Sequence, residues 1–214
     1  LLLLDYWPLK RFDKSLEDLI IESANQALQS SHIQSFSQIN LIVVASMTAS
    51  QLQHQGHLSS LVTQLLGTSC PVISVDAACS SSSSALGVGL HMINSRFGHL
   101  QTPQTALIIG AEKLTDHDSH IVAESLMRAA SYAEEGIHGL TFPALGALIA
   151  QKYIHQYQPP KNLLETIAIK NHKQGIHNPI AHFCREIKPE QYQKSALVAD
   201  PLKLLDCAPV SDGA

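Results

Sequence analysis

The stretch that decides the fold is Leu41-Ile42-Val43-Val44-Ala45, an apolar run rich in β-branched residues. Such a run is typical of a strand that is buried on both faces of a parallel sheet. Similar runs follow at residues 71–76 and 105–110. A stretch with apolar residues at helical spacing precedes each run, at residues 15–31, 57–66 and 81–95. This alternation with short connections predicts an α/β layered fold with a largely parallel core.

The ends of two of these helices carry recognisable signals. Ser15 is placed to cap the first helix, with Asp18 in its first turn, where a carboxylate suits the helix dipole. Gly67 is placed to end the second helix.

The pattern changes near residue 112. Up to residue 209 no comparable buried strand is found, and helices are expected at about 119–131, 141–157 and 162–173. Asn178-Pro179 and Lys188-Pro189 predict loops. We therefore divide the chain into an α/β domain at residues 1–111 and a helical cap with a return segment at residues 112–214.

Composition narrows the classes of partner. The 214 residues carry a formal charge of −4, only 15% are charged, and no basic run is present, so nucleic acid is not an expected partner. No stretch approaches the roughly 20 apolar residues of a membrane span. The run Leu1–Leu4 stops at Asp5 and has no basic residue before it, so it does not read as a secretory signal. We expect a cytoplasmic protein that buries much of its surface, in part against another chain.

The four cysteines have neither metal-ligand spacing nor the density of a disulfide scaffold. We therefore expect no bound metal, and we expect the thiols to be reduced. Only Cys79 has a special setting, because Val75-Asp76-Ala77-Ala78-Cys79-Ser80-Ser81 reads as a strand end, a tight turn and a helix start. A helix N-terminus favours the thiolate form, which a nucleophile requires. The alternative is that Cys79 is a small core residue beside well-capping serines.

Several segments, in this order, resemble the N-terminal half of the thiolase superfamily, and specifically thiolases of the sterol-carrier-protein (lipid-transfer-protein-like) type. The resemblance covers nearly the whole chain from about Lys14. The segments that carry it are Cys79–Asp116, Gly139–Leu145, Lys170–Lys173, Asn178–Phe183, Ala199–Leu202 and Leu205–Ala214.

The resemblance implies an acyl-CoA acyltransferase with Cys79 as the residue that takes the acyl group as a thioester. It implies a coenzyme A thioester as substrate, no other cofactor, and a homodimer or homotetramer or a hetero-oligomeric complex. Many thiolases place a serine that contacts pantetheine near Ala208, where this chain has no hydroxyl. His172 belongs to the family's Asn-His mark, and we interpret it as structural or substrate-adjacent and not as the base.

The family's activating histidine lies in a Gly-His-Pro motif of its C-terminal half, together with a second catalytic cysteine. No Gly-His-Pro occurs in this sequence. We therefore expect the chain to be part of a longer enzyme, with its C-terminal domain missing, and to be inactive alone. Two alternatives remain open: a β-ketoacyl synthase, whose nucleophile turn is similar, and a non-catalytic subunit that binds acyl-CoA or lipid or acts as a scaffold.

Overall fold

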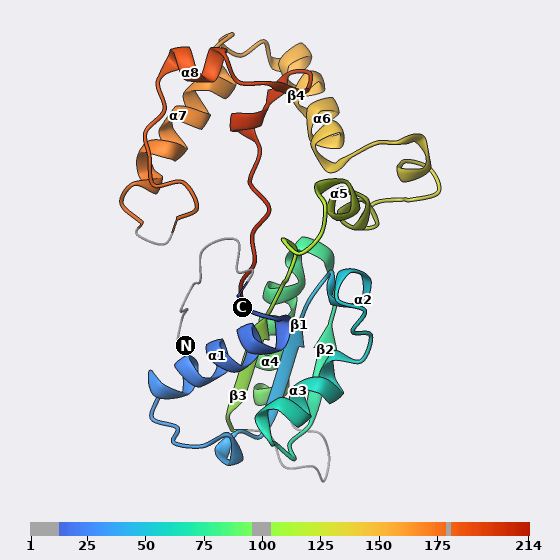
Figure 1. The fold of residues 1–214 in the computed structure, drawn as a ribbon, viewed down its shortest axis with the longest axis vertical. Coiled ribbons are helices and arrows are strands. Elements are labelled where there is room, and N and C mark those ends of the chain that lie inside the picture. Colours follow the sequence, from blue (N-terminus) through green and yellow to red (C-terminus); the bar gives the residue numbers. More distant parts are fainter. Residues whose placement is uncertain (1–12, 96–103, 179–180) are drawn as a thin grey trace. The chain divides into compact units, whose positions relative to one another are not determined.

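A computed structural model describes residues 13–95, 104–178 and 181–214. The chain forms two compact units, Leu1–His117 with Ser211–Ala214 (the α/β unit) and Asp118–Val210 (the helical unit). Figure 1 shows both units as ribbons. The Leu1–Leu4 run, and Pro179 and Ile180 of the family-like segments, lie outside the described residues.

The α/β unit is built on a parallel sheet in the order β2-β1-β3. The strands are β1 (Leu41–Ala45), β2 (Val72–Val75) and β3 (Ala106–Gly110). All five residues of β1 are buried, as the continuous apolar run predicts for the central strand. The predicted strands are thus confirmed, each within a residue or so of its expected ends.

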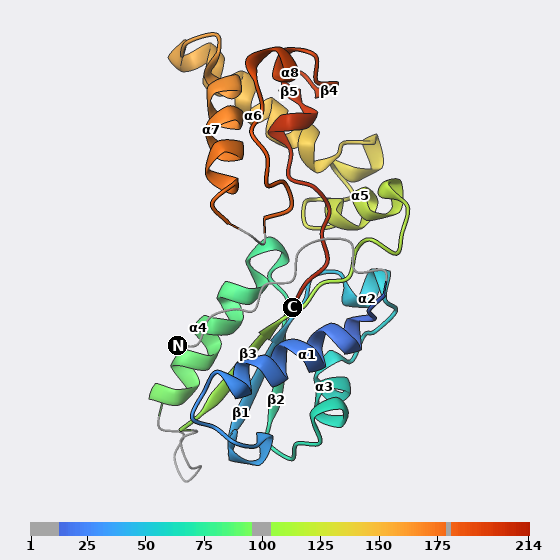
Figure 2. The same ribbon diagram turned by 60° about the vertical axis from the view of Figure 1, so that its left-hand side comes forward.

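Helices cover both faces of this sheet (Figure 2). Ile42 and Val44 pack with α1 (Leu16–Gln29) and α3 (Leu58–Leu66) on one face. Val43 and its neighbours on the other face pack against α4 (Ser81–Asn94). Alternate side chains of β1 therefore enter two separate apolar layers, which is why the strand carries no polar residue.

The predicted helix ends are confirmed. The Asp18 amide donates to Ser15 Oγ at 3.1 Å, and the Ser15 amide donates to the Asp18 carboxylate at 3.0 Å. The Ser15 amide and the Ser15 hydroxyl both donate to the Asp18 carboxylate, and these two bonds lower the pKa of Asp18. Gly67 ends α3 with a positive φ of 58°, a conformation that glycine adopts without steric cost.

Small residues let α4 approach the sheet closely. Its buried positions are Ser81, Ala85 and Gly89, one helical turn apart. A Cβ built on Gly89 would lie 2.5 Å from Ile108 Cδ1, so a larger side chain there would displace β3 or its side chains. The helix that begins at the Cys79 turn is therefore held firmly on the strands.

The helical unit contains α5 (Ser119–Met127), α6 (Phe142–Tyr157), α7 (Leu163–Gly175) and α8 (Pro189–Gln193). A short antiparallel pair, β4 (Leu197–Ala199) and β5 (Leu202–Lys203), follows α8. The loop predicted at Lys188-Pro189 is wrong, because Pro189 is the first residue of α8, where its missing N–H is not needed. The remaining short helices are α2 (Ala49–Leu52), η1 (Phe36–Gln38), η2 (Ala78–Ser80), η3 (Gly136–His138) and η4 (Leu204–Asp206).

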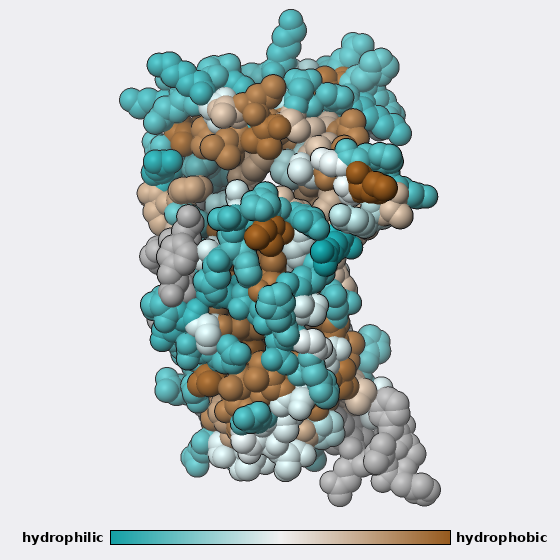
Figure 3. Space-filling model, turned by 45° about the vertical axis from the view of Figure 1, so that its right-hand side comes forward, coloured by the Kyte–Doolittle hydropathy of each residue, from teal (hydrophilic) through white to brown (hydrophobic). Residues whose placement is uncertain are grey.

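Apolar side chains reach the surface of both units (Figure 3). Leu90 is 48% exposed in the α/β unit, and Ile149 is 72% exposed in the helical unit. Among the helices of the described ranges, none combines the length and the apolar character needed to cross a bilayer.

Candidate active site

Cys79 lies where the sequence places it, between a strand and a helix. Strand β2 ends at Val75, η2 carries Cys79 in its middle position, and α4 begins at Ser81. The thiol-bearing residue is exposed. Its alternative reading as a core residue is therefore wrong for the α/β unit.

The backbone of this turn is held in an unusual conformation. Ala78 has a φ of +51°, in the left-handed region that a residue with a Cβ rarely enters. Its amide donates to the Asp76 carboxylate at 3.0 Å. Ser81 Oγ accepts from the Ala77 amide at 2.9 Å and donates to the Ala78 carbonyl at 2.6 Å. Ser80 Oγ donates to the Ala77 carbonyl at 2.7 Å.

The arrangement leaves donors available beside the sulfur. Within the part of the chain that the structure describes, the Cys79 amide has no hydrogen-bond acceptor. The first turn of α4 follows directly, with its positive dipole end toward Cys79. An exposed thiol beside a vacant N–H and a helix start is suited to attack a carbonyl carbon and to stabilise the oxyanion that forms.

The other three cysteines have different surroundings. Cys70 is half-buried, accepts a hydrogen bond from Thr68 Oγ1 at 3.2 Å and packs against the core. Cys184 is exposed, and its Sγ donates to two backbone carbonyls. Burial, assisted by the Asp206 charge, raises the pKa of the Cys207 thiol. None of them stands at the start of a helix that follows a strand of the parallel sheet.

A polar cluster that sequence reasoning missed lies at the ends of β1 and β3; we call it the strand-end cluster, formed by Glu112, Lys113 and Asp212. The Glu112 carboxylate accepts from the amides of Met47 and Thr48 and from the Thr48 hydroxyl. These contacts fix the loop after β1, where α2 begins. An antiparallel bridge joins Glu112 to Gly213, which brings the return segment back to the sheet.

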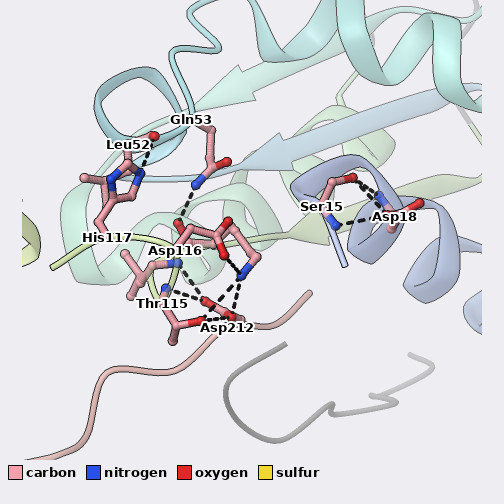
Figure 4. Close-up of polar contacts among 10 residues, drawn as sticks. Ser15, Asp18, Leu52, Gln53, Thr115, Asp116, His117 and Asp212 are labelled. Atoms are coloured by element: carbon pink, nitrogen blue, oxygen red, sulfur yellow. Dashed lines mark hydrogen bonds and ion pairs between the residues drawn. The ribbon is translucent and has the colours of Figure 1, made fainter. Parts of the chain in front are cut away.

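Asp212 is the centre of this cluster (Figure 4). Its fully buried carboxylate lies 2.8 Å from Lys113 Nζ, and it accepts from the Leu114 and Thr115 amides at 2.7 and 2.9 Å. Lys113 Nζ also contacts Asp116 at 2.7 Å. In the sequence, the residues of this cluster are marked only by the two segments Ala111–Asp116 and Ser211–Ala214, which carry part of the family resemblance. Nothing in the sequence indicates that these two segments pair.

The pKa values of Asp212 and Lys113 follow from burial opposed by hydrogen bonds and charge. Burial alone would raise the pKa of Asp212, but hydrogen bonds from Lys113, from the Thr115 hydroxyl and from two backbone amides hold it at about 2. Burial alone would lower the pKa of Lys113, but Asp116 and Asp212 outweigh it and raise that pKa. Both groups are therefore charged at neutral pH and serve as a structural ion pair.

Several of the segments that carry the family resemblance lie in the helical unit and make local contacts there. Gly139 has a φ of 78°, and the Thr141 hydroxyl accepts from the Ala144 amide at 3.4 Å at the start of α6. The ring of His172, on α7, stacks on Phe183 with centroids 6.0 Å apart. The segment Ala199–Leu202 makes the turn between β4 and β5.

Tyr192 and Asp206 form a second polar contact in this unit. The phenol lies 2.9 Å from the Asp206 carboxylate, which also accepts from the Lys203 amide at 2.8 Å. Burial, with the Asp206 and Glu165 charges, raises the pKa of Tyr192. Ala208 follows η4 and is exposed, in a different unit from Cys79. Within the described ranges, no group of three or more His, Cys, Asp or Glu side chains could hold a metal ion.

The sequence profile described as "Thiolase, N-terminal domain" matches residues 10–214. The chain belongs to the thiolase family. The resemblance predicted from the sequence is thereby confirmed, and the match is to the N-terminal half of thiolases.

Curated relatives include two acetyl-CoA acetyltransferases and a sterol carrier protein. The chain is 32% identical over 204 residues to the acetyl-CoA acetyltransferase of Methanothermobacter thermautotrophicus, covering 95% of this chain and 51% of that protein. It is 34% identical over 205 residues to the enzyme of the same name from Methanocaldococcus jannaschii, covering 95% and 50%. It is 26% identical over 157 residues to sterol carrier protein 2 of Bos taurus, covering 69% and 27%. The chain spans about half the length of the archaeal thiolases that it matches.

Solved structures confirm the predicted thiolase fold. The structure titled "Ltp2-ChsH2(DUF35) aldolase" aligns with a TM-score of 0.64 at 21% identity, covering 98% of this chain and 51% of that one. The acetyl-CoA acetyltransferase of Syntrophomonas wolfei aligns with a TM-score of 0.58 at 15% identity, covering 89% and 55%. The α/β unit with its helical insertion is thus the N-terminal part of a thiolase fold.

Proposed function

We propose that this thiolase-family chain provides the nucleophile of an acyl-CoA acyltransferase and that Cys79 is that nucleophile. The observation that carries the proposal is an exposed cysteine on a tightly held turn at the start of α4, in a chain that matches thiolases along nearly its whole length. The substrate is a 3-oxoacyl-CoA thioester, and no cofactor besides coenzyme A is required.

The chemistry balances in two steps. In the cleavage direction the Cys79 thiolate attacks the 3-oxo carbon, and the Cys79 amide is placed to donate to the oxyanion. The bond between carbons 2 and 3 then breaks, its electron pair leaves with acetyl-CoA, and a proton is taken up at carbon 2. The thiol of a second coenzyme A attacks the acyl-enzyme thioester, loses its proton, and releases the shortened acyl-CoA with the Cys79 thiolate restored.

The groups that carry protons in these steps do not come from a Gly-His-Pro motif of this chain, because none is present. We expect the residues supplying them to lie outside it, in a C-terminal half or in a partner. We also expect assembly with other chains, either identical copies or a second polypeptide.

The test compares two exposed cysteines of the intact natural protein. Cys79 should react with iodoacetamide much faster than Cys184, with labelling located by peptide mass spectrometry. Cys79→Ala should abolish cleavage of acetoacetyl-CoA, whereas Cys184→Ala should leave it unchanged. Equal labelling of the two cysteines, or cleavage that survives Cys79→Ala, would refute Cys79 as the nucleophile. A wild type that labels both cysteines equally and cleaves no acetoacetyl-CoA would favour the non-catalytic subunit. Transfer from an acyl carrier protein but not from coenzyme A would favour the β-ketoacyl synthase alternative.

A further inference from the structure

The Ser81 side chain differs from the other serines of its run. It is only 5% exposed, whereas Ser80, Ser82 and Ser83 are exposed. Its hydroxyl accepts from the Ala77 amide and donates to the Ala78 carbonyl. One side chain therefore binds the backbone on both sides of the Ala77–Ala78 linkage, just before Cys79.

Helix capping does not account for these bonds. The residue in the N-cap position of α4 is Ser80, and no side chain there accepts from a helix amide. The Ser81 hydroxyl forms its hydrogen bonds with the preceding turn and not with the amides of α4. A cap would satisfy the amides of the second or third helical residue.

The bonds counteract an unfavourable backbone conformation. Ala78 has a φ of +51°, which brings its Cβ too close to backbone oxygen. The Ala78 carbonyl also accepts from the Ser81 amide. When the Ser81 hydroxyl is removed, its bonds to the Ala77 amide and to the Ala78 carbonyl are both lost. Ala78 is then expected to relax toward negative φ, and this rotation changes the direction of the Cys79 amide and thiol. Ser81 itself is fixed, because Ala85 and Gly89 on the same helix face pack against the sheet.

We propose that Ser81 is a positioning residue for the Cys79 nucleophile: its buried hydroxyl holds Ala78 in the left-handed conformation that directs the Cys79 amide and sulfur. The inference rests on the proposed function, since it assigns to Ser81 the geometry of that same site. The exposed Asp76 carboxylate also holds this turn, because it accepts a hydrogen bond from the Ala78 amide at a donor–acceptor distance of 3.0 Å.

The experiment measures alkylation of each cysteine in the intact natural protein with iodoacetamide. Ser81→Ala should slow Cys79 alkylation about tenfold, the order expected when two hydrogen bonds are lost. Ser83→Ala is the matched control, because Ser83 Oγ donates to the Ser80 carbonyl and not to the Ala77–Ala78 linkage, and it should change the rate less than twofold. The half-buried Cys70 reports on folding, and its rate should stay constant in both variants.

A second substitution separates positioning from a general structural role. Glycine adopts positive φ readily, so Ala78→Gly added to Ser81→Ala should restore most of the Cys79 rate. In acetoacetyl-CoA cleavage, Ser81→Ala should lower kcat and leave KM within twofold. If Ser81→Ala unfolds the unit, Cys70 will be labelled faster, and Ser81→Thr then replaces it as the test variant. Threonine keeps the hydroxyl, so Ser81→Thr should retain fast Cys79 labelling.

The outcomes separate the two proposals. Fast Cys79 labelling in the wild type that persists unchanged in folded Ser81→Ala overturns the role of Ser81 and leaves the proposed function intact. Slow Cys79 labelling in folded Ser81→Thr, or no recovery in the Ala78→Gly double variant, also overturns it. A wild-type Cys79 that reacts no faster than Cys184 refutes the proposed function itself.

Discussion

Replacing Asp212 by Asn should destabilise the α/β unit by an amount that depends on pH. Asp212 is fully buried, 2.8 Å from Lys113 Nζ, and accepts from two backbone amides. Removing one partner of a buried ion pair costs about 3–5 kcal/mol. Asp116 remains 2.7 Å from Lys113 Nζ and keeps a counter-charge beside it, so we expect the lower end, about 3 kcal/mol at pH 7.

The pH dependence follows from the depressed pKa of Asp212. Its fall from 3.8 to about 2 corresponds to about 2 kcal/mol of folding free energy that is present above pH 4. That contribution is lost as the pH falls from about 4 to about 2, because the unfolded state then takes up the proton more readily. The raised pKa of Lys113 also stabilises the folded state, but that stabilisation is complete below pH 10.5 and is lost only at higher pH. It therefore does not alter the dependence between pH 4 and pH 2.

Urea unfolding followed by far-ultraviolet circular dichroism, at pH 7, 5, 3 and 2, measures both effects. The gap between the wild type and Asp212→Asn should shrink by about 2 kcal/mol between pH 5 and pH 2. Asp116→Asn is the control, and since its carboxylate is 40% exposed it should cost less than about 1 kcal/mol. A gap that stays constant with pH, or an Asp212→Asn variant as stable as the wild type at pH 7, would refute the reasoning.

Two further predictions concern packing and polar contacts. Ile42→Ala, in the fully buried central strand, should lower the free energy of unfolding by about 2–5 kcal/mol in the same urea assay. A loss below about 1 kcal/mol would show that the apolar layer beneath α1 and α3 does not depend on β1. Tyr192→Phe should cost about 1–2 kcal/mol, because the phenol that donates to Asp206 at 2.9 Å is lost while the ring remains; a thermal midpoint equal to that of the wild type would contradict this.

Local sequence patterns were sufficient for the α/β unit. The run at Leu41–Ala45 indicates a strand with two buried faces, and the structure places it between β2 and β3. Ser15 and Gly67 mark helix ends because their signals act within a few residues. The same holds for Cys79, whose strand, turn and helix are contiguous in sequence.

Contacts between distant residues could not be predicted in this way. Lys113 and Asp212 are 99 positions apart, and the residues next to each of them in the sequence do not indicate that the two side chains pair. The pair β4–β5 is not predicted by the sequence, because its strands are only three and two residues long and two of the three residues of β4 are exposed. Lys188-Pro189 predicts a loop because the sequence alone does not distinguish a proline in a loop from a proline at the first position of a short helix such as α8.

The two polar arrangements of the α/β unit bear differently on catalysis. A structural role is sufficient to account for the strand-end cluster, since Glu112 and Asp212 accept hydrogen bonds from backbone amides and Asp212 pairs with a buried ammonium group. A scaffold subunit would need that cluster as much as an enzyme does. The Cys79 turn is different, because it keeps Ala78 in an unfavourable conformation and because the Cys79 amide has no acceptor among the residues that the structure describes. Neither feature adds stability, and backbone strain of this kind is concentrated at functional sites. The strain at Ala78 therefore favours the nucleophile over the scaffold as the role of this turn.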